Sequence, residues 1–229
     1  MSETQASRNV PETVSAPHGG DGLPSLFARN RAWANYKTLV DPSFFSRLIG
    51  QQHPSYFWIG CSDSRVPATE IVNLDPGEMF VHRNVANLAM ESDPNFAAAL
   101  QFAIEVLHVE HVIVVGHYGC GGIQAAMIPA TNDAIGNWLA PVRALHHDHP
   151  CMAVSNQPDP DALCERNVVA QVQALATNPL VHAAWDAQAK LTLHGWIYSI
   201  SDGLLRTVCE AVHGRLSTPP PFVDGVDAP

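Results

Sequence analysis

The seven residues His111-Val112-Ile113-Val114-Val115-Gly116-His117 decide the fold. Four consecutive β-branched residues at 112–115 predict a central strand, because such side chains are stiff and pack well in a sheet. A helix is expected before this strand, over 95–108, with apolar residues on one face and Asn95 as a possible cap. Another strand, over 79–85, precedes the helix. The order strand, helix, strand predicts a right-handed parallel crossover.

The remaining elements are expected on both sides of this unit. The run Tyr56-Phe57-Trp58-Ile59-Gly60-Cys61 is apolar and ends in small or polar residues, as buried parallel strands do at a functional edge. Further helices are expected over 24–36, from 42 on, and over 121–127, 137–146 and 161–176, and further strands over 191–200 and 204–209. The 229 residues therefore predict one α/β domain over 24–217, between an extended or disordered arm (1–23) and a flexible Pro-rich tail (218–229).

Charge and composition exclude several classes of partner. The formal net charge of −10 disfavours nucleic acid and anionic membranes, which would both repel the chain. The first residues contain no apolar core of a signal peptide, and no apolar run reaches the roughly 20 residues of a membrane-spanning helix. We therefore expect a cytoplasmic protein without a membrane or nucleic-acid partner.

The five cysteines do not form the pattern of a disulfide framework, because their number is odd and their spacing wide. In a reducing compartment such thiols are packed, nucleophilic or metal-bound. Cys151, Cys164 and Cys209 are expected to be packed or free. Cys61 and Cys120 have sequence neighbours that suggest metal binding.

Two expected strands end in residues that can bind metal: one at Cys61, the other at His117, which is followed closely by Cys120. In open parallel sheets, sites form where the carboxyl ends of strands meet. Two thiolates and one imidazole suit tetrahedral zinc, and three protein ligands leave the fourth position open, as in catalytic sites. The alternative is that these side chains merely pack in the core.

Asp63 and Arg65 follow Cys61 at intervals of two residues. A carboxylate so close to a metal can ligate it or accept a hydrogen bond from its water, and Arg65 can hold that carboxylate through a two-pronged pair. The alternative is an ordinary surface ion pair. The glycines near Cys120 match no nucleotide-binding motif and are expected to let the backbone turn at a helix start.

Together these motifs resemble the beta-class carbonic anhydrases. The resemblance rests on Cys61-Ser62-Asp63-Ser64-Arg65 and His117-Tyr118-Gly119-Cys120, and extends to 80–87 and 194–198. It implies reversible hydration of carbon dioxide, one Zn²⁺ held by Cys61, His117 and Cys120, and a catalytic pair of Asp63 and Arg65. It also implies a four- or five-stranded, mainly parallel sheet flanked by helices. The unit would be a homodimer or homotetramer whose N-terminal helical arm reaches the partner subunit.

One subgroup of that family closes its site when bicarbonate binds a nearby inhibitory pocket, and the aspartate then becomes the fourth zinc ligand. Trp58, Arg83 and Tyr198 match the pocket of this subgroup. The resemblance therefore implies bicarbonate inhibition at low pH through these residues and Asp63. The alternative for Trp58 and Tyr198 is ordinary core packing.

Two functional alternatives and one local one stay open. The same scaffold supports hydrolysis of carbonyl sulfide or carbon disulfide, and a zinc protein could sense bicarbonate without catalysis. The cluster His146-His147-Asp148-His149 could bind a second metal, but a solvated polar loop is favoured because no strand or turn organises the imidazoles.

Overall fold

The computed structural model describes residues 22–50, 52–148 and 158–215, and the chain divides into two compact units, Met1–Ile49 and Gly50–Pro229. The expected Pro-rich tail, the arm up to residue 21, and His149 and Cys151 lie outside the described residues. Within the described ranges, no helix has both the length and the apolar character needed to cross a membrane.

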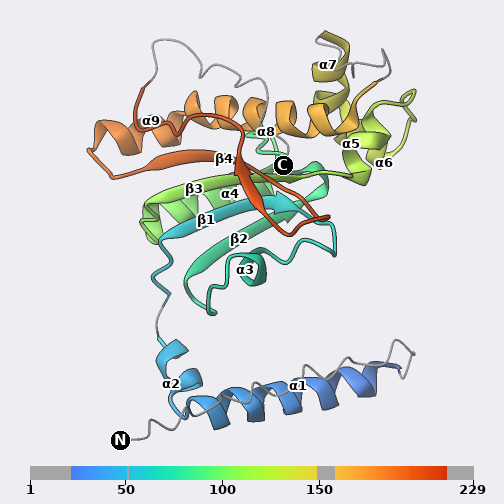
Figure 1. The fold of residues 1–229 in the computed structure, drawn as a ribbon. Coiled ribbons are helices and arrows are strands. Elements are labelled where there is room, and N and C mark those ends of the chain that lie inside the picture. The colour runs from blue at the N-terminus through green and yellow to red at the C-terminus, as the bar shows by residue number, and fades with distance from the viewer. Residues whose placement is uncertain (1–21, 51, 149–157, 216–229) are drawn as a thin grey trace, which may run out of the picture. The chain divides into compact units, whose positions relative to one another are not determined.

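Five strands of the second unit form one sheet in the order β2-β1-β3-β4-β5 (Figure 1). Strands β1 to β4 run parallel, and β5 pairs antiparallel with β4. Strand β3 is central, as predicted, and the α/β fold with a mainly parallel five-stranded sheet is confirmed. The bounds are β1 (Tyr56–Cys61), β2 (Met79–Asn84), β3 (His111–His117), β4 (Thr192–Tyr198) and β5 (Leu205–Thr207).

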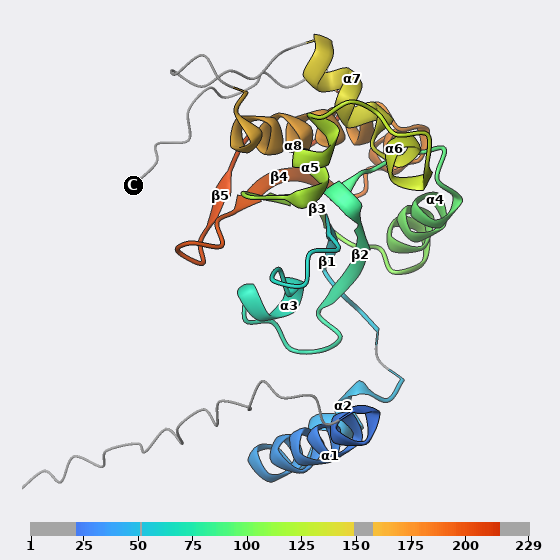
Figure 2. The same cartoon turned by 90° about the vertical axis from the view of Figure 1, so that its right-hand side faces the viewer.

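Most helices of this unit pack on one face of the sheet, and the short α3 lies on the other (Figures 1 and 2). The larger core contains Phe57 and Ile59 of β1 and lies under α8, whereas Trp58 points into a smaller core that also includes Ala68 of α3. This division follows the alternation of side chains along a strand. The helices of the second unit are α3 (Ala68–Ile71), α4 (Pro94–Gln101), α5 (Gly121–Ala126), α6 (Ala134–Trp138), α7 (Ala140–Asp148), α8 (Pro160–Ala176) and α9 (Pro179–Asp186), with a 3-10 turn η1 (Val85–Asn87) and a π-helical turn η2 (Phe102–Val106).

The start of α4 corrects one expectation. Asp93, not Asn95, caps the helix: its carboxylate accepts the backbone N–H of Asn95 at 3.0 Å. Pro94 occupies the first helical position, where its missing N–H costs nothing, so the cap must lie one residue before it. Helices α8 and α9 begin in the same way, at Asp159-Pro160 and Asn178-Pro179.

Other boundaries differ from expectation for local reasons. The single helix expected over 137–146 is two helices, α6 and α7, and α6 starts earlier than expected because Asp133 accepts the N–H of Gly136 and caps it. Residues 146–148 form the end of α7 rather than a polar loop. The last two strands are shorter than expected, and α3 and α9 were not anticipated.

In its described residues the first unit contains α1 (Gly22–Val40) and α2 (Phe44–Leu48), so an N-terminal helix is present. Trp33 contacts the rings of Phe44 and Phe45 edge to face, with centroids 6.3 and 5.7 Å apart. Leu26, Phe27 and Leu39 remain exposed on α1 in this single chain.

Candidate metal centre

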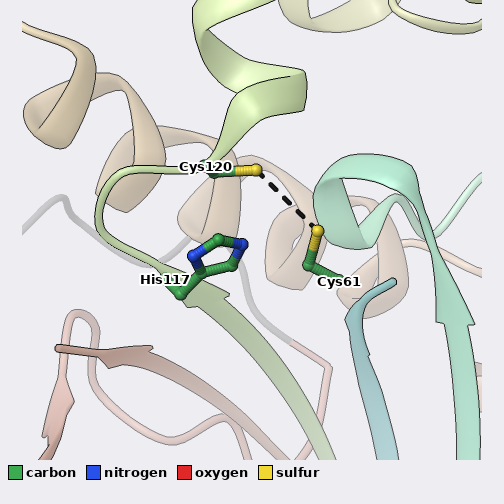
Figure 3. Close-up of side chains that lie close together, drawn as sticks. All are labelled: Cys61, His117 and Cys120. Atoms are coloured by element: carbon green, nitrogen blue, oxygen red, sulfur yellow. Dashed lines mark hydrogen bonds between the residues drawn. The ribbon is translucent and has the colours of Figure 1, made fainter. Parts of the chain in front are cut away.

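The carboxyl edge of the sheet brings three potential ligands together (Figure 3). Cys61 ends β1, His117 ends the adjacent parallel strand β3, and Cys120 immediately precedes α5. One ligand atom from each lies within 4.8 Å of the others, and all three side chains are buried. The convergence expected from the strand ends is therefore confirmed, and among the described residues this is the only such group of three or more His, Cys, Asp or Glu side chains.

The sulfur atoms of Cys61 and Cys120 are 3.8 Å apart. A disulfide requires about 2.0 Å, so both cysteines are free. Two sulfurs bound to one tetrahedral zinc ion lie about 3.8 Å apart, because each Zn–S bond is about 2.3 Å long. The spacing of the pair thus fits a shared zinc ion.

The Nε2 atom of His117 lies beside the two sulfurs and has no hydrogen-bond partner. Its Nδ1 lies 3.0 Å from the carbonyl oxygen of Tyr118, which can only accept, so Nδ1 carries the proton. Its Nε2 is buried and has no hydrogen-bond partner. A buried polar atom without a partner is costly, and a metal ion would satisfy its lone pair. The donor set and its geometry therefore fit zinc.

The two thiols are electrostatically unequal. A hydrogen bond from Cys120 lowers the pKa of Cys61 to about 4, and the nearby His117 and the backbone N–H groups of Asp63 and Ala86 lower it further against the effect of burial. The same bond raises the pKa of Cys120. The pair readily holds one negative charge, and thiolate is the form in which cysteine binds metal.

Two glycines allow the second ligand segment to take its shape. Gly119 has a φ of +66°, the left-handed conformation that glycine adopts without strain. At Gly122, an added Cβ would come within 2.8 Å of the Val85 side chain. The expectation that glycines shape the backbone near Cys120 is thus met at these positions.

Asp63 and Arg65 form a two-pronged pair beside the metal centre. Arg65 donates from Nε to Oδ1 of Asp63 at 3.0 Å and from Nη2 to Oδ2 at 2.7 Å, and its backbone N–H adds a third bond of 2.9 Å. These bonds hold the pKa of Asp63 well below its ordinary value. Oδ2 lies 3.7 Å from Nε2 of His117. The carboxylate therefore faces the point where the three ligand atoms meet.

Two of the three residues of the expected bicarbonate pocket share the smaller core, and the third, Arg83, contacts the segment that carries Asp63. Trp58 is buried in the smaller core together with Tyr198, and a side chain at Gly60 would collide with the Trp58 indole. Arg83 pairs with Gly60 across the β1–β2 register. Its guanidinium donates to the carbonyl oxygens of Cys61 at 2.8 Å and Asp63 at 2.5 Å.

Helix α8 supplies contacts that the sequence reasoning missed. Asp161 accepts the backbone N–H of Gly119 at 3.1 Å, and Glu165 accepts the hydroxyl of Tyr118. Both carboxylates thus hold the segment between His117 and Cys120. No motif or spacing signals them, because α8 lies about forty residues further along the chain.

Known proteins resemble this chain in sequence and in structure. A family model described as carbonic anhydrase matches residues 56–205. A carbonic anhydrase of Emericella nidulans is 38% identical over 184 residues, covering 79% of this chain and 81% of that protein. The structure of a Coccomyxa beta-carbonic anhydrase in complex with acetazolamide has a TM-score of 0.80 and 33% identity, covering 85% of this chain and 90% of that chain. The structure of one of two tetrameric beta-carbonic anhydrases from Sordaria macrospora has a TM-score of 0.78 and 33% identity, covering 82% of this chain and 98% of that chain.

These likenesses extend across both segments that carry the ligands, since the family match begins at β1 and ends at β5. The Cys61–His117–Cys120 group is consistent with the zinc site of such enzymes. The chain belongs to the carbonic anhydrase family, in its beta class.

Proposed function

We propose that the chain catalyses the reversible hydration of carbon dioxide to bicarbonate and a proton, with one zinc ion held by Cys61, His117 and Cys120. The observation that carries this proposal is the buried cluster itself, with its sulfurs 3.8 Å apart and the Nε2 of His117 unpartnered. Zinc bound by two thiolates and an imidazole supplies a Lewis acid that makes water a nucleophile near neutral pH.

Asp63 orients the nucleophile as a hydrogen-bond acceptor. Its low pKa makes it a poor general base near pH 7, but keeps it ionised and able to accept throughout the working range. Arg65 fixes the carboxylate in one orientation through three hydrogen bonds. The pair thus restricts the direction from which a water molecule can approach carbon dioxide.

Stopped-flow measurement of carbon dioxide hydration from about pH 6.5 to 9, on protein of known zinc content, tests this function. Activity at one zinc per chain, lost with a chelator and restored by zinc, is expected. Protein that binds zinc but is inactive throughout would contradict it and leave a bicarbonate-binding zinc protein. A parallel assay with carbonyl sulfide and carbon disulfide distinguishes the hydrolase alternative.

Bicarbonate inhibition through Trp58, Arg83 and Tyr198 is the second part of the proposal. Arg83 already holds the carbonyl oxygens of Cys61 and Asp63, so an anion that recruits its guanidinium would perturb the turn that carries Asp63. On this mechanism Asp63 would separate from Arg65 and would serve as a fourth protein ligand of the zinc ion. Inhibition is then strongest at low pH, and by reciprocity a closed site binds bicarbonate more tightly.

The Tyr198→Phe variant tests the regulatory part, because it removes only a hydroxyl from a nearly buried ring. We expect bicarbonate inhibition at pH 7 to weaken while activity at pH 9 is retained. Tyr36→Phe on α1 is the matched control. Equal inhibition in all three proteins would refute the role of Tyr198.

Assembly into a homodimer or homotetramer is the third part. The exposed apolar side chains of Leu26, Phe27 and Leu39 on α1 support it, as does the tetrameric state of the Sordaria macrospora homologues. Light scattering should give a mass of two or four chains, and replacing these three residues with Ser should lower it.

A further inference from the structure

The turn that follows β2 is held in a strained conformation next to the metal centre. Ala86 and Asn87 have φ angles of +67° and +48°, although neither is glycine. Both residues are buried, with exposed fractions of 0% and 2%. Asparagine adopts this conformation comparatively readily, but alanine keeps it only where the surrounding structure imposes it.

This turn contacts both ligand segments. The backbone N–H of Ala86 is one of the groups that lower the pKa of Cys61, so it lies near that sulfur. On the other side, a Cβ at Gly122, two residues after Cys120, would lie 3.3 Å from the Cβ of Ala86 and 3.4 Å from its nitrogen. The conformation of Ala86 therefore affects the positions of both sulfur ligands.

Two buried amide side chains of α8 hold the turn. Asn167 donates from Nδ2 to the carbonyl oxygen of Ala86 at 2.9 Å, and Gln171 donates from Nε2 to Oδ1 of Asn167 at 3.0 Å. Oε1 of Gln171 then accepts the backbone N–H of Ala89 at 2.9 Å. This series of hydrogen bonds begins at the carbonyl oxygen of Ala86, which can only accept, and ends at the N–H of Ala89, which can only donate. The orientation of both side-chain amides is therefore determined.

The burial of these amides indicates a specific role. Asn167 is fully buried and Gln171 is 9% exposed, one helical turn apart on α8. Burial of amides is unfavourable unless every polar atom is paired, and here the two amides pair the buried carbonyl oxygen of Ala86 and the buried N–H of Ala89, which apolar side chains would leave without partners. The one element that they connect is the turn from Ala86 to Ala89.

We propose that Asn167 and Gln171 are positioning residues of the metal centre: they lock Ala86 in its left-handed conformation, so that its N–H points at the Cys61 sulfur and zinc binds to a preformed pair of thiolates. This inference rests on the zinc site proposed above. Hydrogen bonds behind metal ligands typically contribute about 10- to 100-fold to metal affinity.

The test measures zinc affinity of the metal-free protein by competition with a chromophoric chelator, in the wild type, Asn167→Leu and Gln171→Met. We expect affinity to fall about tenfold in each variant. The visible spectrum of the Co²⁺ protein should change as well, because it reports ligand geometry. Val181→Ala, a core substitution on α9, is the control: it should lower the melting temperature without changing affinity.

A rescue experiment separates positioning from general stability. Glycine adopts left-handed conformations without strain, so Ala86→Gly in the Asn167→Leu background should recover most of the lost affinity. If Asn167→Leu does not fold, Gln171→Met alone and with Ala86→Gly decides the matter. Affinity within twofold of wild type in Gln171→Met, or no rescue, overturns the inference. Absence of zinc binding in the wild type would instead refute the proposed function.

Discussion

Two histidines on the same strand, at its opposite ends, have different surroundings. His111 begins β3, and its Nδ1 lies 3.1 Å from Nε2 of His194 on the neighbouring strand β4. Its ring also stacks on Tyr56, with centroids 5.6 Å apart. His117 ends β3, and its Nε2 has no hydrogen-bond partner. At the amino end the histidines pair with each other, whereas at the carboxyl end one nitrogen is left for a metal.

This difference shows that residue type alone does not identify a ligand. Both positions offer an imidazole at a sheet edge, but only the carboxyl end adds two sulfurs and a carboxylate. A nitrogen that already shares a proton with another imidazole gains less from a metal ion than one buried without a partner. The two ends of β3 therefore provide internal controls for each other.

The largest expected effect comes from a matched pair of substitutions, His117→Phe and His111→Phe. His117→Phe should abolish zinc binding and reduce kcat/KM more than about 100-fold, beyond the range for residues behind the ligands. His111→Phe should keep one zinc per chain and near-normal activity, because only one hydrogen bond is lost. Metal analysis and stopped-flow assays measure both, and zinc loss in His111→Phe would contradict the division between the two ends.

The next largest effect on activity is expected from the removal of a carboxylate charge at Asp63, compared with the same change at Glu110. Asp63→Asn should lower kcat about 100-fold while zinc content stays at one per chain, because the acceptor for the nucleophile is weakened but the ligands remain. Glu110→Gln, directly before β3, is the control and should be neutral. Unchanged hydration by Asp63→Asn at pH 8 would show that Asp63 serves only as a partner for Arg65.

A smaller effect, on zinc affinity, is expected from removal of the hydroxyl of Tyr118, compared with that of Tyr56. Tyr118→Phe removes the hydroxyl that binds Glu165 behind His117, and zinc affinity should fall about tenfold. Tyr56→Phe, at the amino end, should not change it. Chelator competition measures both, and equal affinities would mean that the contact with α8 does not position the ligand segment.

The smallest expected effect is a pH dependence of stability, caused by His194 beside the amino-terminal end of β3. Burial, followed by the charges of His111 and His213, lowers the pKa of His194 from 6.5 to about 4. Between these values the unfolded chain binds a proton that the folded chain does not, so the free energy of unfolding must fall as pH drops from about 6.5 to 4. Because His194 is only half-buried, we expect a loss of about 1–2 kcal/mol.

Urea unfolding at several pH values measures this contribution of His194 to the free energy of unfolding. His194→Gln should show a shallower dependence on pH than the wild type, with the contribution of zinc release common to both proteins. Parallel curves would mean that the histidine pair does not contribute to acid sensitivity.

Local patterns predicted most of the sheet. Strands β1, β2 and β3 were expected within one residue of their observed bounds, since apolar and β-branched runs flanked by polar residues allow few alternatives. The start of α4 differs from the expectation at Asn95 because Pro94 occupies the first helical position and Asp93 caps the helix. The same Asx-Pro pair that starts α4 and α8 also starts α9, so this missed helix carried a readable signal.

The candidate ligands were also readable, because cysteine and histidine at strand ends are few and chemically distinct. The residues behind them were not. Asn167 and Gln171 fall within α8, where the sequence offers no reason to prefer them over the other polar residues of the helix. Only the packing of α8 against the sheet brings them to Ala86, 81 residues away from Asn167.

The sequence by itself determined the strand order along the chain, the Cys-His-Cys donor set and the adjacent Asp63-Arg65 pair, because each depends on residues close together or on side chains of unusual chemistry. Tertiary structure alone decided which histidine has a free nitrogen, how far apart the sulfurs lie, and which side chains of α8 hold the ligand segments. The physical reason is that hydrogen-bond satisfaction and burial are properties of contacts between distant segments, which local patterns do not encode.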